Sequence, residues 1–378
     1  MTFTSQTLFP GDLFESAARF AEDADKKLAP IAEPSARAQA RATIWREAAA
    51  LGWSGVLIEE ELGGVGGGLL ELAAVLEGCG RFALPVPVLA AFGVGPLLIA
   101  ALGGKRKSEL LNSIAAATTV VCPVLDPLDI SKPRSRSDTG LSAKVEGDRV
   151  LLDGEVRGVE TVPGATHYLI ACSIERSGTS APALCLIPAA SKGISVRDRI
   201  RMDGRASADL RFSAVAVGMP DMLATGEAVR AALGEVRDKA ALLAGVETVA
   251  AMGALLEQTI AYLSERKQFG ATLSSFQVLR HYVADMYVAY ENLRALLNSV
   301  LRKVAAEPAS AWEEVALAKL RLSDVARFFA HSAIQLHGGM GVTEELQATR
   351  LAKRILMSDF EYGDGAFHAE RLLGARAA

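Results

Sequence analysis

The apolar residues of this chain change their spacing twice, and the two changes limit the folds open to it. Helical spacing runs through residues 1–118, short strand-like runs between turn residues fill 119–222, and helical spacing returns over 223–378. A helix repeats about every 3.6 residues and a strand about every two, so a change of spacing marks a change of secondary structure. We therefore predict an α+β multidomain fold: an N-terminal α-helical domain, a small middle β-barrel or sandwich domain, and a C-terminal four-helix bundle.

The same spacing predicts the individual elements. Helices are expected over Leu8–Ala29, Ala36–Leu51, Leu69–Gly80, Ala240–Glu265, Phe276–Lys303, Trp312–His337, Leu346–Met357 and Ala366–Ala375. Strands are expected over Thr118–Val124, Ala143–Glu146, Val150–Leu152, Tyr168–Ile174, Ala183–Pro188 and Leu210–Val217. Gly147-Asp148 and Asp153-Gly154 predict turns between strands, and the Pro- and Ser-rich stretch Asp126–Gly140 predicts a loop.

Composition indicates a packed globular protein. Half of the 378 residues are apolar and 22% are charged, and the length exceeds the ~250–300 residues at which one core stops growing. Lys plus Arg (40) nearly balances Asp plus Glu (44), which argues against a nucleic-acid surface. The four scattered cysteines have no metal-binding spacing, and no signal peptide is recognisable, so we expect reduced thiols and a cytoplasmic protein.

Two segments could suggest other classes of protein. Phe82–Gly104 carries no charge, but Pro85, Pro87 and Pro96 interrupt it, so we expect buried helix pieces and no membrane span. The glycine-rich run Gly63–Gly68 has no clear preceding strand and no Gly-Lys-Ser after it. It therefore predicts a flexible turn before a helix and not a phosphate-binding P-loop.

Two turns in the C-terminal part carry groups that could hold a dinucleotide. The first reads Arg266-Lys267-Gln268-Phe269-Gly270, followed by Phe276-Gln277, and the second reads Gln335-Leu336-His337-Gly338-Gly339-Met340-Gly341. Arginine suits a pyrophosphate, glutamine can hydrogen-bond phosphate or ribose, and glycine lets backbone N–H groups come close. Taken singly, Arg266 could be a cation at a helix C terminus, Gly338-Gly339 a helix stop, and His337 a packing or capping residue.

These turns resemble the C-terminal half of the acyl-CoA dehydrogenase family, where an R-x-Q-F-G turn and a Q-x-x-G-G-x-G turn hold FAD. The family's three-part architecture also matches the predicted order of domains. The resemblance implies oxidation of an acyl-CoA thioester to its α,β-unsaturated form, with a carboxylate as base, FAD as hydride acceptor and an electron-transfer flavoprotein as partner. The residues implied to contact the FAD of a neighbouring subunit are Arg266, Gln268, Phe269, Phe276, Gln277, Gln335, Gly338 and Gly339.

Family members carry the base at one of two sites. The commoner site follows the tyrosine of a Y-E-G-T turn, and here that turn reads Tyr362-Gly363-Asp364-Gly365, with glycine in place of the glutamate. The other site lies on the first helix of the C-terminal domain. There Glu247 is the lone acid among small residues, which suggests close approach by another body, and that body could be flavin plus substrate. We predict Glu247 as base and Asp364 as runner-up; a solvated surface Glu247 and a helix-capping Asp364 are the alternatives.

The middle domain departs from the family pattern. The T-E-P-x-A-G-S-D and W-I-T-N segments that wall the flavin ring are replaced by Cys122–Asp129 and Gly154–Thr161. Some bacterial relatives are hetero-oligomers of two unlike chains with flavin between them. The chain could therefore belong to a homo-oligomer or to a heterotetramer, or be a non-catalytic partner that completes a sister chain's FAD site. A flavin monooxygenase or nitroalkane oxidase relative is a further alternative.

Overall fold

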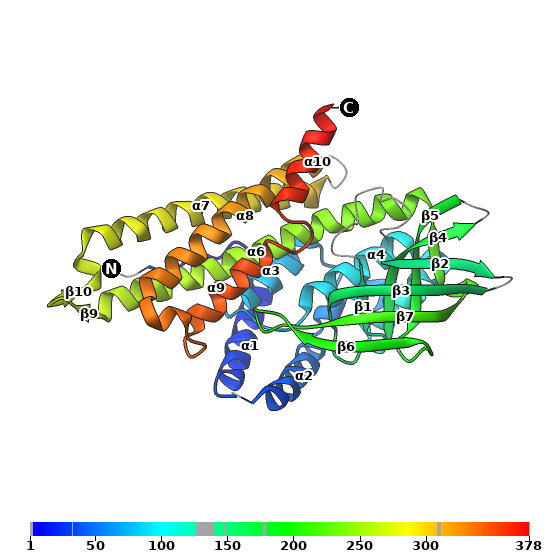
Figure 1. The fold of residues 1–378 in the computed structure, drawn as a ribbon, viewed down its shortest axis with the longest axis horizontal. Coiled ribbons are helices and arrows are strands. Elements are labelled where there is room, and N and C mark those ends of the chain that lie inside the picture. Colours follow the sequence, from blue (N-terminus) through cyan, green and yellow to red (C-terminus); the bar gives the residue numbers. More distant parts are fainter. Residues whose placement is uncertain are drawn as a thin grey trace.

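The computed structural model describes residues 3–31, 33–125, 140–146, 149–176, 179–307 and 311–377. Figure 1 shows N-terminal helices, a sheet at one end of the molecule, and a long C-terminal bundle. The N-terminal helices are α1 (Asp12–Leu28), α2 (Pro34–Ala50), α3 (Leu69–Gly80), α4 (Gly95–Leu102) and α5 (Lys107–Ala115). This helix, sheet, helix order confirms the fold class expected from the spacing of apolar residues.

The glycine-rich run is a tightly packed turn. Gly63 and Gly66 have φ values of 80° and 70°, which favour glycine, and a Cβ at Gly64 would overlap the carbonyl of Ile58. Helix α3 then begins at Leu69 as predicted, with the Glu71 carboxylate accepting a 2.7 Å hydrogen bond from the Gly68 N–H. The glycines are thus required for close backbone approach, which the sequence interpretation of a flexible turn did not include.

The uncharged segment Phe82–Gly104 forms buried helix pieces. A π-helical turn over Leu89–Val94 leads directly into α4, whose first turn holds Pro96. The C-terminal helix α6 (Glu227–Glu265) is long and apolar enough to cross a membrane, but 94% of its most apolar window is buried inside the fold. Among the described residues α6 is therefore the central helix of the core.

The middle domain is a mixed sheet of eight strands. These are β1 (Val121–Val124), β2 (Leu141–Glu146), β3 (Arg149–Glu160), β4 (His167–Arg176), β5 (Thr179–Pro188), β6 (Ile194–Ile200), β7 (Ala206–Gly218) and β8 (Met222–Thr225). Their order is β6-β7-β3-β2-β4-β5-β8, and β1 pairs in parallel with β4 on the edge that β2 also uses. Parallel pairing of β4 with both strands makes the sheet mixed.

Two expectations for this domain need correction. Asp153-Gly154 is not a turn, because it lies inside β3 at a register shift between Leu152 and Gly154, where Gly154 has a φ of 131°. A β-bulge and a hairpin turn both favour glycine, so composition could not separate them. Strand β6 was also not predicted as a separate element. Gly147-Asp148 and residues 126–139 of the expected loop lie outside the described residues.

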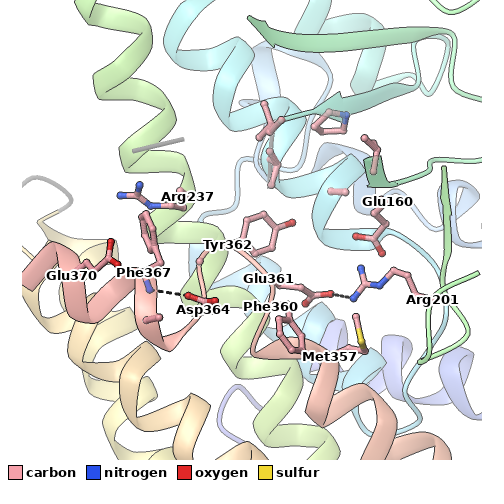
Figure 2. Close-up of a pocket in the computed structure, with 18 residues that line it drawn as sticks. Glu160, Arg201, Arg237, Met357, Phe360, Glu361, Tyr362, Asp364, Phe367 and Glu370 are labelled. Carbon is pink, nitrogen blue, oxygen red and sulfur yellow. Dashed lines mark hydrogen bonds and ion pairs between the residues drawn. The ribbon is translucent and has the colours of Figure 1, made fainter. Parts of the chain in front are cut away.

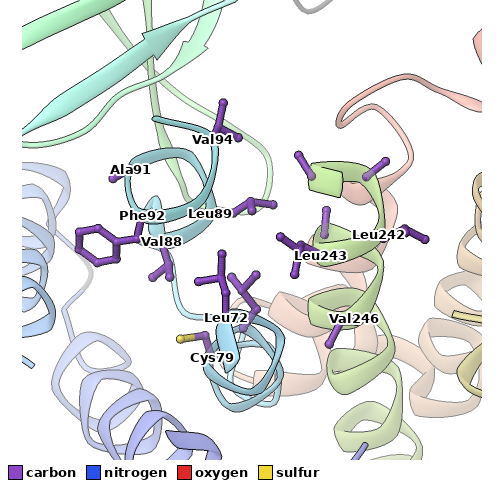
Figure 3. Packing of buried hydrophobic residues seen from close by; sticks show 14 of the residues in the cluster. Leu72, Cys79, Val88, Leu89, Ala91, Phe92, Val94, Leu242, Leu243 and Val246 are labelled. Carbon is purple, nitrogen blue, oxygen red and sulfur yellow. The ribbon is translucent and has the colours of Figure 1, made fainter. Parts of the chain in front are cut away.

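The C-terminal part is a bundle of α6, α7 (Gln277–Ala306), α8 (Trp312–His337) and α9 (Gln347–Ser358), and α10 (Gly365–Ala377) packs against α8. Helix α8 has the bounds that the sequence predicts. A short hairpin of β9 (Lys267–Gln268) and β10 (Ala271–Thr272) joins α6 to α7. The bundle and the N-terminal domain share one core. Figure 3 shows Leu72 of α3, Leu89 of the π-helical turn and Leu243 of α6 meeting there.

Candidate functional site

A cavity with a volume of about 610 Å³ lies between the sheet and the bundle. Figure 2 shows its lining, which comes from the π-helical turn, β1, β3, α6 and the segment from the end of α9 into α10. Apolar and charged groups share this wall. Ala90, Val94, Leu125, Met357 and Phe360 are among the apolar residues, and Glu160, Arg201, Arg237, Glu361, Asp364 and Glu370 are the charged ones.

The Tyr362–Gly365 turn forms part of the cavity wall but has no room for a side chain at position 363. Gly363 has a φ of 95°, and an added Cβ would overlap the Phe367 ring and lie 2.8 Å from Nε2 of His368. Tyr362 also has a positive φ of 55°. The glutamate of the family's Y-E-G-T turn could not be accommodated here without moving α10.

Asp364 lies on the cavity wall, but one of its oxygens has a structural task. Its Oδ1 accepts a 2.8 Å hydrogen bond from the Phe367 N–H, which satisfies a free donor of the first turn of α10. This is the helix-capping alternative that the sequence left open.

Glu247 is 1% exposed and forms ion pairs with two arginines, so the solvated alternative does not hold. One oxygen contacts Arg205, and the other accepts a hydrogen bond from Arg354 at 3.1 Å. Glu247 is also not among the described residues that line the cavity. The geometry gives no free oxygen for substrate, and Glu247 as base stays a prediction.

The small residues around Glu247 have a packing reason. A Cβ at Gly80 of α3 would overlap the backbone carbonyl of Glu247, and one at Gly245 would lie 2.9 Å from the Leu297 side chain of α7. The bodies that approach α6 so closely are therefore neighbouring helices. This corrects the interpretation of the small-residue stripe as space for flavin and substrate.

A buried network of charges joins Glu247 to the cavity. Arg354 of α9 contacts Asp203 at 3.1 Å and Glu361 at 2.6 Å, and Arg201 contacts Glu361 at 2.5 Å. Burial alone would raise the pKa of Glu361, but Arg354 and Arg201 outweigh it and hold that pKa well below its usual range. Glu361 is thus an anion with two guanidinium partners.

Glu160 differs from the other carboxylates of this network. It is the last residue of β3 and lines the cavity, and its one hydrogen bond among the described residues comes from Arg205 Nη1 at 3.4 Å. Burial raises the pKa of Glu160, although Arg205 and Arg201 act to lower it. Glu160 was not predicted as a site residue from the sequence. It lies in the Gly154–Thr161 segment, which replaces a segment that walls the flavin in the family, and that position could have indicated a place near the site.

The cationic turn has its side chains free. Arg266 ends α6, and the side chains of Arg266 and Gln268 have no hydrogen-bond partner in the described part of the chain. Phe269 is 90% exposed with a φ of 55°, and its ring contacts Phe276 edge to face at 6.2 Å. Gln277 is the first residue of α7.

The glycine turn lies beside the cationic turn. Gly338 has a φ of 58°, and a Cβ at Gly338 or Gly339 would meet nothing within 4 Å, so the backbone is open to close approach. His337 is buried, stacks on Tyr262 of α6 at 4.7 Å, and its Nδ1 lies 2.9 Å from the Ala333 carbonyl. His337 is therefore the packing residue that the sequence indicated, and its stacking holds the ends of α6 and α8 together.

The two turns lie at one end of the bundle, whereas the sheet that forms part of the cavity wall lies toward the other end of the molecule (Figure 1). Helix α9 runs from the glycine turn to the cavity wall and spans 12 residues, which corresponds to a length of about 18 Å at about 1.5 Å per residue. The structure therefore brings the predicted cofactor residues together, but it separates them from this chain's own cavity, Asp364 and Glu247.

Sequence and structure comparisons identify the family. Residues 12–117 match the acyl-CoA dehydrogenase N-terminal domain and residues 230–376 match the acyl-CoA dehydrogenase C-terminal domain. The chain belongs to the acyl-CoA dehydrogenase family. A probable acyl-CoA dehydrogenase of Bacillus subtilis is 26% identical over 86% of this chain and 87% of its own length.

Two solved structures of similar fold cover nearly the whole chain. The ChsE4-ChsE5 complex from Mycobacterium tuberculosis has a TM-score of 0.80 at 21% identity over 98% of this chain and 99% of that chain. A variant of the Tcur3481-Tcur3483 steroid ACAD has a TM-score of 0.79 at 26% identity over the same shares. The neighbours also include complexes with FAD.

This acyl-CoA dehydrogenase is an FAD-dependent oxidoreductase, and FAD supplies the hydride acceptor of its reaction when bound. The donors of the two turns fit that group. The exposed Arg266 guanidinium suits a pyrophosphate, the amides of Gln268 and Gln335 suit phosphate or ribose, and the open backbone at Gly338 allows close approach. The same residues would thus hold FAD at the turn end of the bundle.

Proposed function

We propose that this chain is a subunit of an oligomeric acyl-CoA dehydrogenase whose turns hold the FAD of a neighbouring subunit. The exposure of the donors of these turns, apart from the chain's own cavity, carries this proposal, because it leaves them available to a cofactor in a neighbouring subunit. A symmetric pair of subunits can bring the donors to such a cofactor by packing the bundle of one subunit against the other. A monomer in light scattering at micromolar concentration would remove the proposal.

We infer that the cavity takes the acyl group of a CoA thioester. Its volume of about 610 Å³ falls in the usual range for small-molecule sites, and its lining is partly apolar. A base in this pocket removes the α-proton, and burial keeps water away from the developing charge. The size of the cavity and the steroid-acting neighbour support a bulky acyl group, such as a fatty acid or steroid side chain.

We propose a heterotetramer with a second acyl-CoA dehydrogenase-like chain. The ChsE4-ChsE5 neighbour is a complex of two different chains, and the wall segments of this chain depart from the family pattern. A homo-oligomer is the alternative. An electron-transfer flavoprotein is the partner that we expect to reoxidise the reduced cofactor.

A second candidate function is a non-catalytic partner subunit. Two observations favour it. At one of the family's two base positions the chain has Gly363, which has no side chain, and at the other Glu247 is already paired with two arginines. In that case the sister chain supplies the base, while this chain contributes Arg266 and the Gly338 turn to the FAD site.

Purification tests these proposals. The chain is produced alone and together with the product of the adjacent gene, and visible absorption, mass and bleaching by acyl-CoA are recorded. We expect the flavin band in the assembly and bleaching by at least one bulky acyl-CoA. Absence of flavin from both preparations would contradict the proposed function. A neighbour that binds flavin and bleaches without this chain would contradict the heterotetramer.

A further inference from the structure

Among the described carboxylates of the cavity wall, Glu160 is held only by one long contact, whereas Glu361 and Asp364 make shorter ones. Glu361 is held by Arg354 and Arg201, Asp364 caps α10, and Glu247 lies behind the cavity between two arginines. Glu370 of α10 also lines the cavity and is not without a partner. Glu160 keeps only the 3.4 Å contact with Arg205, which is longer than the ~2.7–3.2 Å of an ordinary N–H···O hydrogen bond.

The backbone fixes where Glu160 points. Strand β3 shifts register between Val156 and Val159, where Gly158 adopts a φ of 68°, and the strand ends at Glu160, which pairs with Ser207 of β7. The Glu160 carbonyl also accepts a contact from the Cys122 thiol at 3.6 Å. In Figure 2 the Glu160 carboxylate and the Tyr362 ring stand on opposite sides of the open space.

Arg205 has partners other than Glu160. Its Nη2 donates to the Leu84 carbonyl at 3.4 Å and contacts Glu247, which anchors it on the side away from the cavity. Arg201 is engaged by Glu361 and Asp203. Both arginines therefore stay in place without Glu160, and the Glu160 carboxylate can act on a bound molecule without dissolving the network.

We propose that Glu160 is the catalytic residue that removes the α-proton of the acyl thioester in this cavity. The proposal rests on the proposed function. The α C–H bond breaks and its proton goes to a Glu160 oxygen; FAD, when bound, would supply the acceptor for the β-hydrogen and its electron pair, so that the product carries a carbon–carbon double bond. The raised pKa of Glu160, caused mainly by burial, suits a carboxylate that must accept a proton.

The test follows exchange of the α-proton with solvent, a readout that does not require hydride transfer. The flavin-containing assembly is incubated in D2O with octanoyl-CoA and with a steroid-acid CoA thioester, and deuterium incorporation is followed by mass spectrometry. Glu160→Gln keeps size and polarity but cannot take the proton. We expect it to lower the exchange rate by ~10²–10⁴-fold, with acyl-CoA affinity and FAD content within a few-fold of wild type.

Three variants separate the proton role from a structural one. Glu155→Gln is the matched control, because Glu155 lies on the same strand and pairs with Arg157 outside the cavity, and we expect no change. Glu160→Asp retains a carboxylate and should recover part of the exchange rate. Glu247→Gln tests the competing base, because loss of exchange in that variant together with unchanged exchange in Glu160→Gln would assign the proton transfer to Glu247. Circular dichroism checks that each variant is folded.

The outcomes distinguish a failure of this inference from a failure of the proposed function. Unchanged exchange in a folded Glu160→Gln protein would overturn the inference. Loss of exchange in Glu247→Gln would then assign the base to Glu247, and unchanged exchange in both variants would assign it to the sister chain. A wild-type assembly that binds flavin but exchanges neither thioester would also overturn it. Absence of flavin and exchange together would remove the proposed function as well.

Discussion

The two ends of the helical bundle treat charge in opposite ways. At the cavity end, Arg354 is 1% exposed and shares Glu247, Asp203 and Glu361, so its charge is compensated within the chain. At the turn end, Arg266 is exposed and without a partner in the described part of the chain. A buried charge needs a partner within the folded chain, because water cannot solvate it. An exposed donor is solvated by water until a ligand or another subunit binds it. The cavity end is thus complete in one chain, and the turn end is complete only in an assembly.

Removing Arg354 should break the cavity end most strongly. Arg354→Met leaves three carboxylates with less compensation in a buried site, and breaking such a network typically costs ~3–5 kcal/mol. We expect a loss of this size in the free energy of unfolding, measured with urea at neutral pH. Arg230→Met is the control, because Arg230 is exposed near the start of α6, and we expect a change below ~0.5 kcal/mol. Equal stability of the two variants would show that the network contributes nothing net.

Removing Arg266 should weaken FAD binding by the assembly and leave the stability of the separate chain nearly unchanged. Arg266→Ala takes away an exposed guanidinium, so the free energy of unfolding of the separate chain should be nearly unchanged. A hydrogen bond to a charged group contributes ~1.5–3 kcal/mol, so FAD affinity of the assembly should fall about 10- to 150-fold. Equilibrium dialysis measures that affinity. A destabilised chain with normal FAD affinity would reverse the comparison.

His368 makes stability at the cavity end depend on pH. It is fully buried, and burial together with the Lys319 charge lowers its pKa to about 4. The unfolded chain therefore binds a proton near pH 6.5 that the folded chain does not, so stability is lost as the pH falls from about 6.5 towards 4. Between pH 7 and 5 the loss should be roughly 2 kcal/mol. His368→Gln should show that much less pH dependence; equal dependence would contradict a buried neutral histidine.

A methyl group at Gly363 gives the smallest effect. Gly363→Ala places a side chain in left-handed backbone against Phe367, which we expect to cost ~1–2 kcal/mol of stability. The control is Gly374→Ala, since Gly374 lies in α10 with nothing within 4 Å of an added Cβ, and should be neutral or stabilising. Thermal unfolding of both variants checks this. A neutral Gly363→Ala would show that the turn can adjust.

Sequence patterns predicted what depends on local spacing. Helix α8 has the predicted bounds Trp312–His337, because its apolar stripe is continuous and Gly338 ends it. The cofactor-binding turns could also be predicted, because the binding groups of arginine, glutamine and glycine do not depend on the surrounding fold. Asp153-Gly154 was misread because a bulge and a turn require the same residues.

The candidate base could not be predicted in the same way. The small residues beside Glu247 indicate a close neighbour but not which one, and only the fold shows that Gly80 and Leu297 are opposite. Two arginines distant in sequence, Arg205 and Arg354, meet Glu247 in the core. Glu160 was missed because strand alternation does not say which residue ends at a cavity.

The stack of Tyr262 on His337 has a thermodynamic consequence for cofactor binding. It ties the end of α6 to the end of α8, so the Arg266 turn and the Gly338 turn cannot fluctuate separately. A ligand that orders one turn therefore reduces the conformational entropy that the other turn loses when it binds the same ligand. Contributions of the two turns to FAD affinity are then expected to be non-additive, with this pair of stacked rings as one route of the energetic coupling between them.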